Sequence, residues 1–276
     1  MKVLKFGGTS VASSERIRHV ADLITANNEP KIVVLSAMAG TTNTLVEISR
    51  QLVLKHRHEA LTLLTKLKHK YEVETKALYP NKASYDRSWT VVNETFFFLE
   101  QLCYSDNFTL YDEKKILARG ELLSTAMMLE HLADRGIKAV GLPALEYMRT
   151  DKNAEPDLPY VREALTKLIA RQDEHVKLFI TEGYICRNAF GDVDNLQRGG
   201  SDYTATIVGS VLKADEIQIW TDIDGMHNND PRVVDQTEPV RTLRFEEAQE
   251  LAYFGAKILH PTCIVPAAAS SVPVRL

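Results

Sequence analysis

Glycines beside charged and hydroxyl residues are the first feature of the sequence that could do chemistry. Lys5-Phe6-Gly7-Gly8-Thr9-Ser10 follows an apolar run and precedes a helical pattern. Glycines before a helix can present backbone N–H groups and the helix dipole to a phosphate, and Lys5 would add a positive charge. Because neither GxxxxGK[ST] nor GxGxxG occurs, a structural turn explains this segment about equally well.

A second glycine pair lies in Arg198-Gly199-Gly200-Ser201-Asp202. An arginine can hold a carboxylate through two parallel hydrogen bonds, and the glycines allow the backbone to pass close to a ligand. We expect Ser201 to cap the next helix and Asp202 to be its first residue, where the dipole favours a carboxylate. Capping does not explain the preceding Arg-Gly-Gly, so we interpret the segment as a functional site.

Two further segments lie near predicted helix starts. The loop Ser36-Ala37-Met38-Ala39-Gly40-Thr41-Thr42-Asn43 follows an apolar run and suits either a phosphate- or substrate-binding loop or a helix start capped by Thr42 or Asn43. In Arg119-Gly120-Glu121 the carboxylate could receive a substrate ammonium group. Taken alone, an exposed helical glutamate is the better interpretation of Glu121.

The segment from Trp220 to Arg232 carries acids directly after an apolar run. Thr221 and Asp222 could bind a ribose hydroxyl or a metal, but the DxDxDG pattern of a calcium loop is absent. Lys257 could supply a second positive charge for a nucleotide. His260-Pro261 is more typical of a helix start than of a metal site, because no second histidine follows at helical spacing.

Apolar runs and helical patterns alternate along the chain, and these elements must position the segments above. Buried strands are predicted at residues 3–6, 31–37, 138–142, 177–182 and 216–222, and helices at 13–26, 114–135, 160–171, 201–213 and 244–254. This alternation is typical of an α/β fold with a mostly parallel sheet and helices on both faces. Ligands of such sheets bind beyond the carboxyl ends of the strands.

Residues 45–107 interrupt the alternation and are predicted to form an inserted helical hairpin, with helices at 45–78 and 85–104 around Tyr79-Pro80-Asn81. The first helix carries a set of basic residues that could bind a polyanion, namely Lys55, His56, Arg57, His58, Lys66, Lys68, His69 and Lys70. Acids are interleaved with them, so we favour a solvated surface.

Composition excludes several classes of protein. The 276 residues carry a net charge of -4 without a basic cluster, which argues against nucleic-acid and anionic-membrane partners. No signal peptide or membrane span is apparent. The 3 cysteines form no CxxC pair, which fits a reducing, cytoplasmic setting.

Six motifs together resemble the catalytic domain of the aspartate kinases, in the amino-acid kinase family. KFGGTSV, SAMAGTTN, ARGELLS, RGGSDYTA, WTDIDGMHNNDPR and FGAKILHP stand in the order and spacing of that domain, over nearly the whole chain. The resemblance implies a three-layer α/β sandwich with an inserted hairpin. It also implies ATP-dependent phosphorylation of the side-chain carboxylate of L-aspartate, the first step toward lysine, threonine and methionine.

The resemblance also assigns roles to residues. Lys5 would neutralise the transferring phosphoryl group and Asp202 would orient the lysines. Aspartate would be held by Thr42, Glu121 at its α-ammonium, Arg198 at its α-carboxylate, Gly199, Gly200 and Ser201. ATP would be held by Lys5, Gly7, Gly8, Ser36, Thr221, Asp222, His227, Arg232 and Lys257. Mg²⁺ would be coordinated mainly by ATP, with no metal ligands in the protein. The resemblance is also compatible with a homodimer.

The chain departs from the family at several positions. Cys186 and Gln197 stand where glycine is usual, Asp194 and Asn195 where threonines are usual, and His227 where tyrosine is frequent. The alternatives are another amino-acid kinase, for glutamate, acetylglutamate or uridylate, or a nucleotide-binding regulator without turnover. Aspartate kinases usually continue into regulatory domains that bind the inhibiting amino acid, whereas the last residues here resemble the last strand of the catalytic domain. The resemblance therefore implies a catalytic core at 1–276 without regulatory domains and insensitive to feedback.

Overall fold

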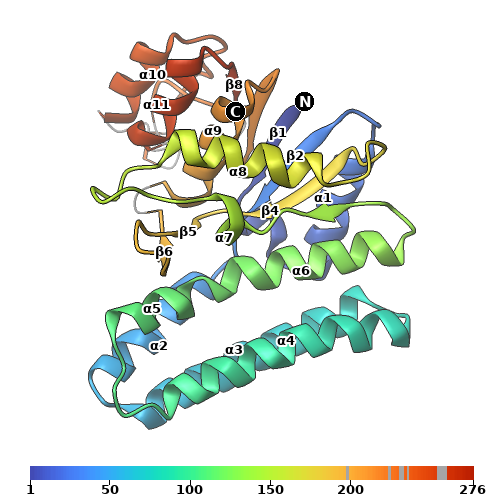
Figure 1. The fold of residues 1–276 in the computed structure, drawn as a ribbon, viewed down its shortest axis with the longest axis vertical. Helices are drawn as coiled ribbons and strands as arrows, with labels where there is room; N and C mark the ends of the chain where they lie inside the picture. The colour runs from blue at the N-terminus through green and yellow to red at the C-terminus, as the bar shows by residue number, and fades with distance from the viewer. Residues whose placement is uncertain (197–198, 223–224, 230–232, 235, 254–259) are drawn as a thin grey trace.

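A six-stranded sheet forms the centre of the computed structural model, which describes the chain except residues 197–198, 223–224, 230–232, 235 and 254–259 (Figure 1). The order is β3-β4-β2-β1-β7-β8, and these neighbours pair in parallel. The predicted mostly parallel sheet is therefore confirmed. Its strands are β1 (Lys2–Phe6), β2 (Lys31–Leu35), β3 (Val140–Gly141), β4 (Leu178–Glu182), β7 (Glu216–Trp220) and β8 (Val274–Arg275).

The sheet separates two apolar cores, because alternate side chains of a strand point to opposite faces. Leu4 and Val33 join one core, whereas Val3 and Val34 join the other. The first core is covered by α1 (Ser14–Thr25), α2 (Thr41–Val53), α3 (Arg57–Leu78), α4 (Lys82–Cys103), α5 (Leu110–Leu117) and α6 (Arg119–Asp134). The second is covered by α7 (Ala144–Tyr147), α8 (Leu158–Ala170), α9 (Gly200–Leu212), α10 (Phe245–Tyr253) and α11 (Pro261–Ser270). The three-layer fold class is thus confirmed.

The insertion differs from its prediction in one respect. The expected helix over residues 45–78 is two helices, α2 and α3, because the chain turns at Lys55, whose φ is 61°. Helical periodicity continues across this turn, so the sequence gives no break signal there. The second helix, α4, begins at Lys82 after the cap Asn81, whose side chain accepts a hydrogen bond from Ala83 N–H. Figure 1 shows α6 between this hairpin and the sheet.

The helix expected over residues 114–135 is also two helices. It begins earlier, at Leu110, because Thr109 and Asp112 form a reciprocal capping box. The axis then breaks at Ala118, and α6 begins at Arg119. The break matters for the site, since it places Glu121 in the first turn of a helix and not in the middle of one.

The carboxyl ends of four neighbouring strands lie level with one another. Phe6 of β1 is paired with Leu35 of β2 and with Trp220 of β7, and Leu35 is paired with Glu182 of β4. The loops that follow these four residues therefore meet at one edge of the sheet. They contain the segments singled out in the sequence.

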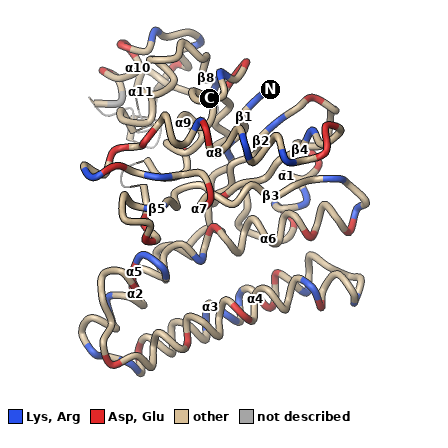
Figure 2. Tube along the Cα trace, viewed as in Figure 1, with Lys and Arg blue, Asp and Glu red and all other residues tan. Residues whose placement is uncertain are grey.

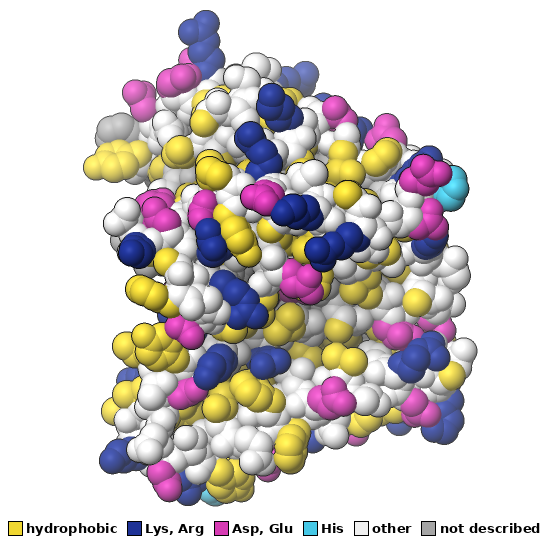
Figure 3. Space-filling view, viewed as in Figure 1, with side chains coloured by type: hydrophobic (Ala, Val, Ile, Leu, Met, Phe, Trp, Pro, Cys, Tyr) yellow, Lys and Arg dark blue, Asp and Glu magenta, His cyan; other side chains and the backbone are white. Residues whose placement is uncertain are grey.

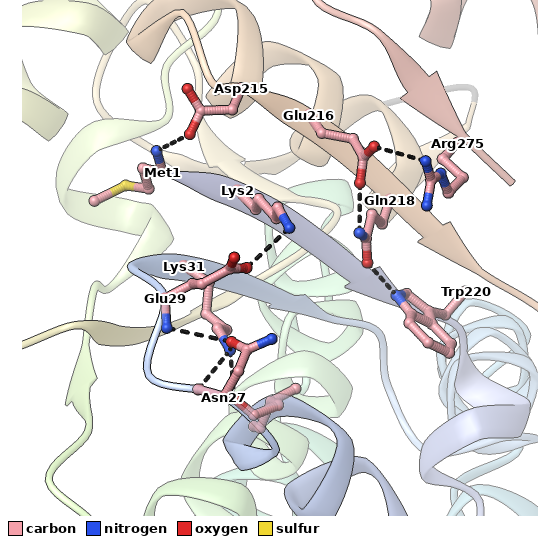
Figure 4. Close-up of polar contacts among 11 residues, drawn as sticks. Met1, Lys2, Asn27, Glu29, Lys31, Asp215, Glu216, Gln218, Trp220 and Arg275 are labelled. Atoms are coloured by element: carbon pink, nitrogen blue, oxygen red, sulfur yellow. Dashed lines mark hydrogen bonds and ion pairs between the residues drawn. The ribbon is translucent and has the colours of Figure 1, made fainter.

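The opposite, amino end of the sheet is held by structural polar contacts (Figure 4). The terminal ammonium of Met1 contacts Asp215 at 2.5 Å, and Lys2 contacts Glu29 at 2.8 Å. The buried Lys31 donates to Ile24 O at 2.9 Å and to Asn27 Oδ1 at 2.7 Å, which satisfies carbonyls at the end of α1. These contacts thus tie the starts of β1, β2 and β7 to the segments that precede them.

Charges of both signs are dispersed over the hairpin and over the molecular face in view (Figures 2 and 3). Along α3, acids are interleaved with the basic residues, and His69 Nδ1 lies 3.6 Å from Glu72 Oε2 on the next turn. This mixture supports the interpretation of a solvated surface and gives no basic stripe for a polyanion. Among the described residues, no helix has both the length and the apolar character needed to cross a membrane.

Candidate active site

An open cavity of about 390 Å³ lies at the carboxyl edge of the sheet. It is lined by six of the predicted site residues and by neighbours from the same loops, namely Gly8, Thr9, Ser36, Ala37, Met38, Ala39, Gly40, Thr42, Asn43, Glu121, Tyr184, Gly200 and Ser201. The loops after β1 and β2 pack closely: a Cβ added to Gly8 would lie 2.7 Å from Ala37 O. The structure thus joins segments that are far apart in the sequence.

Lys5 and Asp202 form an ion pair beside this cavity. Lys5 Nζ lies 2.6 Å from Asp202 Oδ1, and the two side chains are 12% and 19% exposed. Lys5 is the fourth residue of β1, and Asp202 lies in the first turn of α9, which packs against β1. The ammonium group also lies near Gly7, since a Cβ added there would be 3.6 Å from Lys5 Nζ. A screened cation is therefore held next to the glycine loop.

Two helices begin at the cavity without a side-chain cap. The N-cap residues of α2 and α9 are Gly40 and Gly199, each with a φ of 81°. The prediction that Ser201 caps α9, with Asp202 as its first residue, is wrong: the helix begins at Gly200. The capping alternative for Thr42 or Asn43 is likewise wrong. Both helix starts leave N–H groups and positive dipole ends for a ligand.

Glu121 is buried, which overturns the interpretation of an exposed helical glutamate. It is 3% exposed, and its Oε2 makes no hydrogen bond within the described part of the chain. Burial, with a smaller contribution from the nearby Glu182, raises the pKa of this carboxyl to about 8. A buried carboxylate oxygen without a partner is costly, so a cationic group entering the cavity would be strongly favoured there.

Glu182 and Tyr184 belong to the same region but were not assigned from the sequence. Glu182 ends β4, accepts a hydrogen bond from Ala144 N–H at 2.7 Å, and has its pKa raised to about 7 by burial. Tyr184 lines the cavity with a φ of 68°, and its N–H donates to Thr204 Oγ1 at 2.9 Å. The available signal was their position at the end of a strand, on either side of Gly183, where close packing against Ser201 excludes a Cβ.

The segment after β7 lies beside the glycine loop, because Trp220 O would be 3.9 Å from a Cβ added to Gly7. Thr221 and Asp222 are exposed there, and Thr221 Oγ1 donates to Asp222 Oδ1 at 3.1 Å. His227 is instead buried, with Nδ1 2.8 Å from Thr237 Oγ1. The structure thus brings Thr221 and Asp222 to the site edge and turns His227 toward its own loop.

Three of the predicted site residues, Arg198, Arg232 and Lys257, lie outside the described residues, as do Gln197 and Gly255. The other departures from the family pattern are described. Cys186 is buried, Asn195 is buried beside it in the β5–β6 hairpin (Ile185–Arg187 and Val193–Asn195), and Asp194 pairs with Lys114 at 3.0 Å. Asp194 thereby joins the hairpin to α5, whereas the buried side-chain amide of Asn195 makes no hydrogen bond within the described residues. All three positions lie in the hairpin, apart from Lys5, Asp202 and Glu121.

Within the described residues, no three histidine, cysteine, aspartate or glutamate side chains are grouped so that they could hold a metal ion. His260, the one histidine weighed as a ligand, is the N-cap of α11 and accepts a hydrogen bond from Thr262 N–H, as expected for a helix start.

Comparisons with known proteins agree with this geometry. Lysine-sensitive aspartokinase 3 of Escherichia coli is 36% identical over 276 residues, which are 99% of this chain and 60% of that protein. Chloroplastic aspartokinase 1 of Arabidopsis thaliana is 35% identical over 288 residues, covering 99% of this chain and 49% of that protein. The chain thus spans 60% or less of these relatives.

The same likeness appears in three dimensions. The crystal structure of E. coli aspartokinase III in complex with aspartate and ADP superposes with a TM-score of 0.82 and 32% identity, over 99% of this chain and 61% of that one. The resemblance to aspartate kinases noted in the sequence is therefore confirmed. The model of the amino acid kinase family matches residues 1–276, and the chain belongs to that family.

Proposed function

We propose that the chain is the catalytic domain of an aspartate kinase, which transfers the γ-phosphoryl group of ATP to the side-chain carboxylate of L-aspartate. The observation that carries the proposal is the cavity in which a buried, unpartnered Glu121 oxygen lies among uncapped helix starts, beside the Lys5–Asp202 pair. The similar E. coli enzyme has been crystallised with aspartate and ADP.

Binding of aspartate would use its charged groups, the α-ammonium and the two carboxylates. Glu121 would receive the α-ammonium group, which supplies the partner that its Oε2 lacks. The starts of α2 and α9, through Thr42, Gly200 and Ser201, would receive carboxylate oxygens with their N–H groups and dipoles. Arg198 is proposed for the α-carboxylate, and Thr221, Asp222, His227, Arg232 and Lys257 for the nucleotide, from the resemblance.

Phosphoryl transfer would then need alignment and charge screening, and no general base. The attacking carboxylate has a pKa of about 3.9 in free peptides and is ionised at neutral pH. Lys5, oriented by Asp202 at 2.6 Å, would neutralise the phosphoryl oxygens as charge develops. We infer that Mg²⁺ is held by the nucleotide phosphates and water, since Asp202 already pairs with Lys5.

Trapping of the acyl phosphate tests the proposal. The protein is incubated with Mg-ATP, hydroxylamine and either aspartate, glutamate or N-acetylglutamate, and the hydroxamate is measured. We expect hydroxamate from aspartate, and a loss of at least about a hundredfold in Lys5→Met, because one charge on the transferring group is typically worth several kcal/mol. Lys2→Met, at the far end of the same strand, is the control and should retain activity.

Other outcomes separate the alternatives. Hydroxamate from glutamate or acetylglutamate alone would indicate a different amino-acid kinase. In a parallel incubation with UMP as the acceptor, formation of UDP without hydroxamate from aspartate would indicate a uridylate kinase. Nucleotide binding without any product would indicate a regulator. Each of these results would refute the proposed aspartate kinase activity.

A further inference from the structure

We propose that α3 of the inserted hairpin is a positioning element of the active site, acting through Lys70, Tyr71 and Glu74 on the loops that bind phosphate and aspartate. The inference rests on the proposed function. It assigns a role to a helix that the motif pattern leaves as a solvated insertion.

Lys70 is connected to the loops that follow β1 and β2 through one residue, Ala39. Its Nζ donates to Ala39 O at 2.6 Å, while Ala39 N–H donates to Gly8 O at 3.0 Å. Ala39 and Gly8 both line the cavity. Ala39 is thus held by α3 through its carbonyl and by the loop after β1 through its N–H. These two hydrogen bonds fix the spacing of the loops after β1 and β2.

Tyr71 reaches the aspartate side of the cavity. It is fully buried, and its hydroxyl lies 3.0 Å from Oγ1 of Thr41, the first residue of α2. The ring packs against Phe96 of α4, with centroids 5.7 Å apart. Burial raises the pKa of the Tyr71 hydroxyl, and the nearby Glu121 carboxylate adds to this effect.

Thr41 packs closely against Gly120, the residue before Glu121. A Cβ added to Gly120 would lie 3.2 Å from Thr41 Cγ2 and 2.7 Å from Ala37 Cβ. Since Gly120 directly precedes Glu121, a shift of Thr41 would move the turn that carries the carboxylate. The hairpin thus determines where the ammonium-binding oxygen lies.

Glu74, one turn after Lys70, holds the segment that follows the first glycine loop. Its Oε2 accepts the N–H of Ser14 at 2.6 Å, at the start of α1. The guanidinium of Arg18 also donates to Ala77 O, near the end of α3. Both contacts fasten α1 to the same helix that fixes Ala39 and Thr41.

Loss of the Lys70, Tyr71 or Glu74 side chain should therefore affect the binding of aspartate and not the phosphoryl transfer step. None of the three side chains touches the transferring group in this arrangement, so their loss leaves Lys5 and Asp202 in place. It loosens the loops that bind aspartate. We therefore expect the KM for aspartate to rise while kcat changes little.

Steady-state kinetics and thermal melting of Tyr71→Phe and Lys70→Met test the inference. We expect the KM for aspartate to rise about fivefold or more in each variant, because a lost hydrogen bond is worth about 1 kcal/mol, with kcat within about twofold. Lys66→Met, an exposed lysine on the same helix, is the matched control and should match the parent. Lys70→Arg keeps a donor and should restore the parent KM.

An unchanged KM in both variants, or an equal rise in Lys66→Met, would overturn the inference. So would a lower melting temperature with kcat reduced and KM unchanged, since that pattern reports only structural loss. An inactive parent protein would refute the proposed function instead, and the inference with it. The two failures are therefore distinguishable.

Discussion

At the scale of single residues, the site is organised by burial of charge. Glu121 and Glu182 are both buried, and burial raises their pKa values to about 8 and about 7. Lys5 is instead paired with Asp202. Without ligand, the protein therefore holds a neutral acid where the substrate ammonium would bind and a screened cation where the phosphates would bind.

The raised pKa of Glu121 predicts the pH dependence of aspartate binding. Below about pH 8 the ligand-free carboxyl is mainly protonated, and binding of the ammonium requires its ionised form. Raising the pH should therefore lower the KM for aspartate, by up to about tenfold per pH unit, until it levels above the pKa. The measurement is KM for aspartate between pH 6 and 9.

Glu121→Gln provides the control for this prediction. The amide cannot ionise, so the variant should bind aspartate weakly with a KM that is flat over this pH range. A variant that reproduces the slope of the parent would assign the titration to another group and contradict the role of Glu121.

At the scale of elements, strands were easier to predict from the sequence than helix starts. Apolar runs such as residues 31–35 predict buried strands directly, and all five predicted strands are present. The prediction of Ser201 as a cap is wrong, and so is the capping alternative for Thr42, because both are good capping types while the actual N-cap residues are glycines with positive φ. The helix start expected at His260-Pro261 is confirmed. The turn at Lys55 gave no signal, since its neighbours favour helix.

The start of α9 yields a prediction about Gly199. An alanine there would need a φ of 81°, and its Cβ would lie 1.9 Å from Cys263 Sγ. We expect Gly199→Ala to lower the free energy of unfolding by more than about 2 kcal/mol and to impair activity, since strain and overpacking each cost about 1 kcal/mol or more. Chemical denaturation and kcat/KM measure both effects.

Gly136→Ala is the matched control for this substitution. Gly136 has a φ of 70° but no atom within 4 Å of an added Cβ, so it isolates backbone strain. Gly136→Ala should lower the free energy of unfolding by about 1 kcal/mol and leave activity unchanged. Equal effects of the two substitutions would show that contact with Cys263 does not matter.

At the scale of the whole molecule, the sheet brings together what the sequence separates. The α/β class and the carboxyl edge followed from the alternation of strands and helices, and the motifs identified Lys5, Glu121 and Asp202. The contacts of Lys70 with Ala39 and of Tyr71 with Thr41 span 31 and 30 residues, and no local pattern encodes such contacts. The hairpin could therefore be predicted as an insertion, but its contacts with the loops of the cavity could not.

The central claim is that this edge of the sheet transfers a phosphoryl group to the side-chain carboxylate of aspartate. Aspartate labelled with ¹⁸O in that carboxylate, incubated with Mg-ATP and the protein and then treated with hydroxylamine, tests it directly. Hydroxylamine attacks the acyl carbon and releases phosphate with the bridging oxygen, so the account predicts one ¹⁸O in each released phosphate. Phosphate without ¹⁸O, or with ¹⁸O only when the α-carboxylate is labelled, would contradict it.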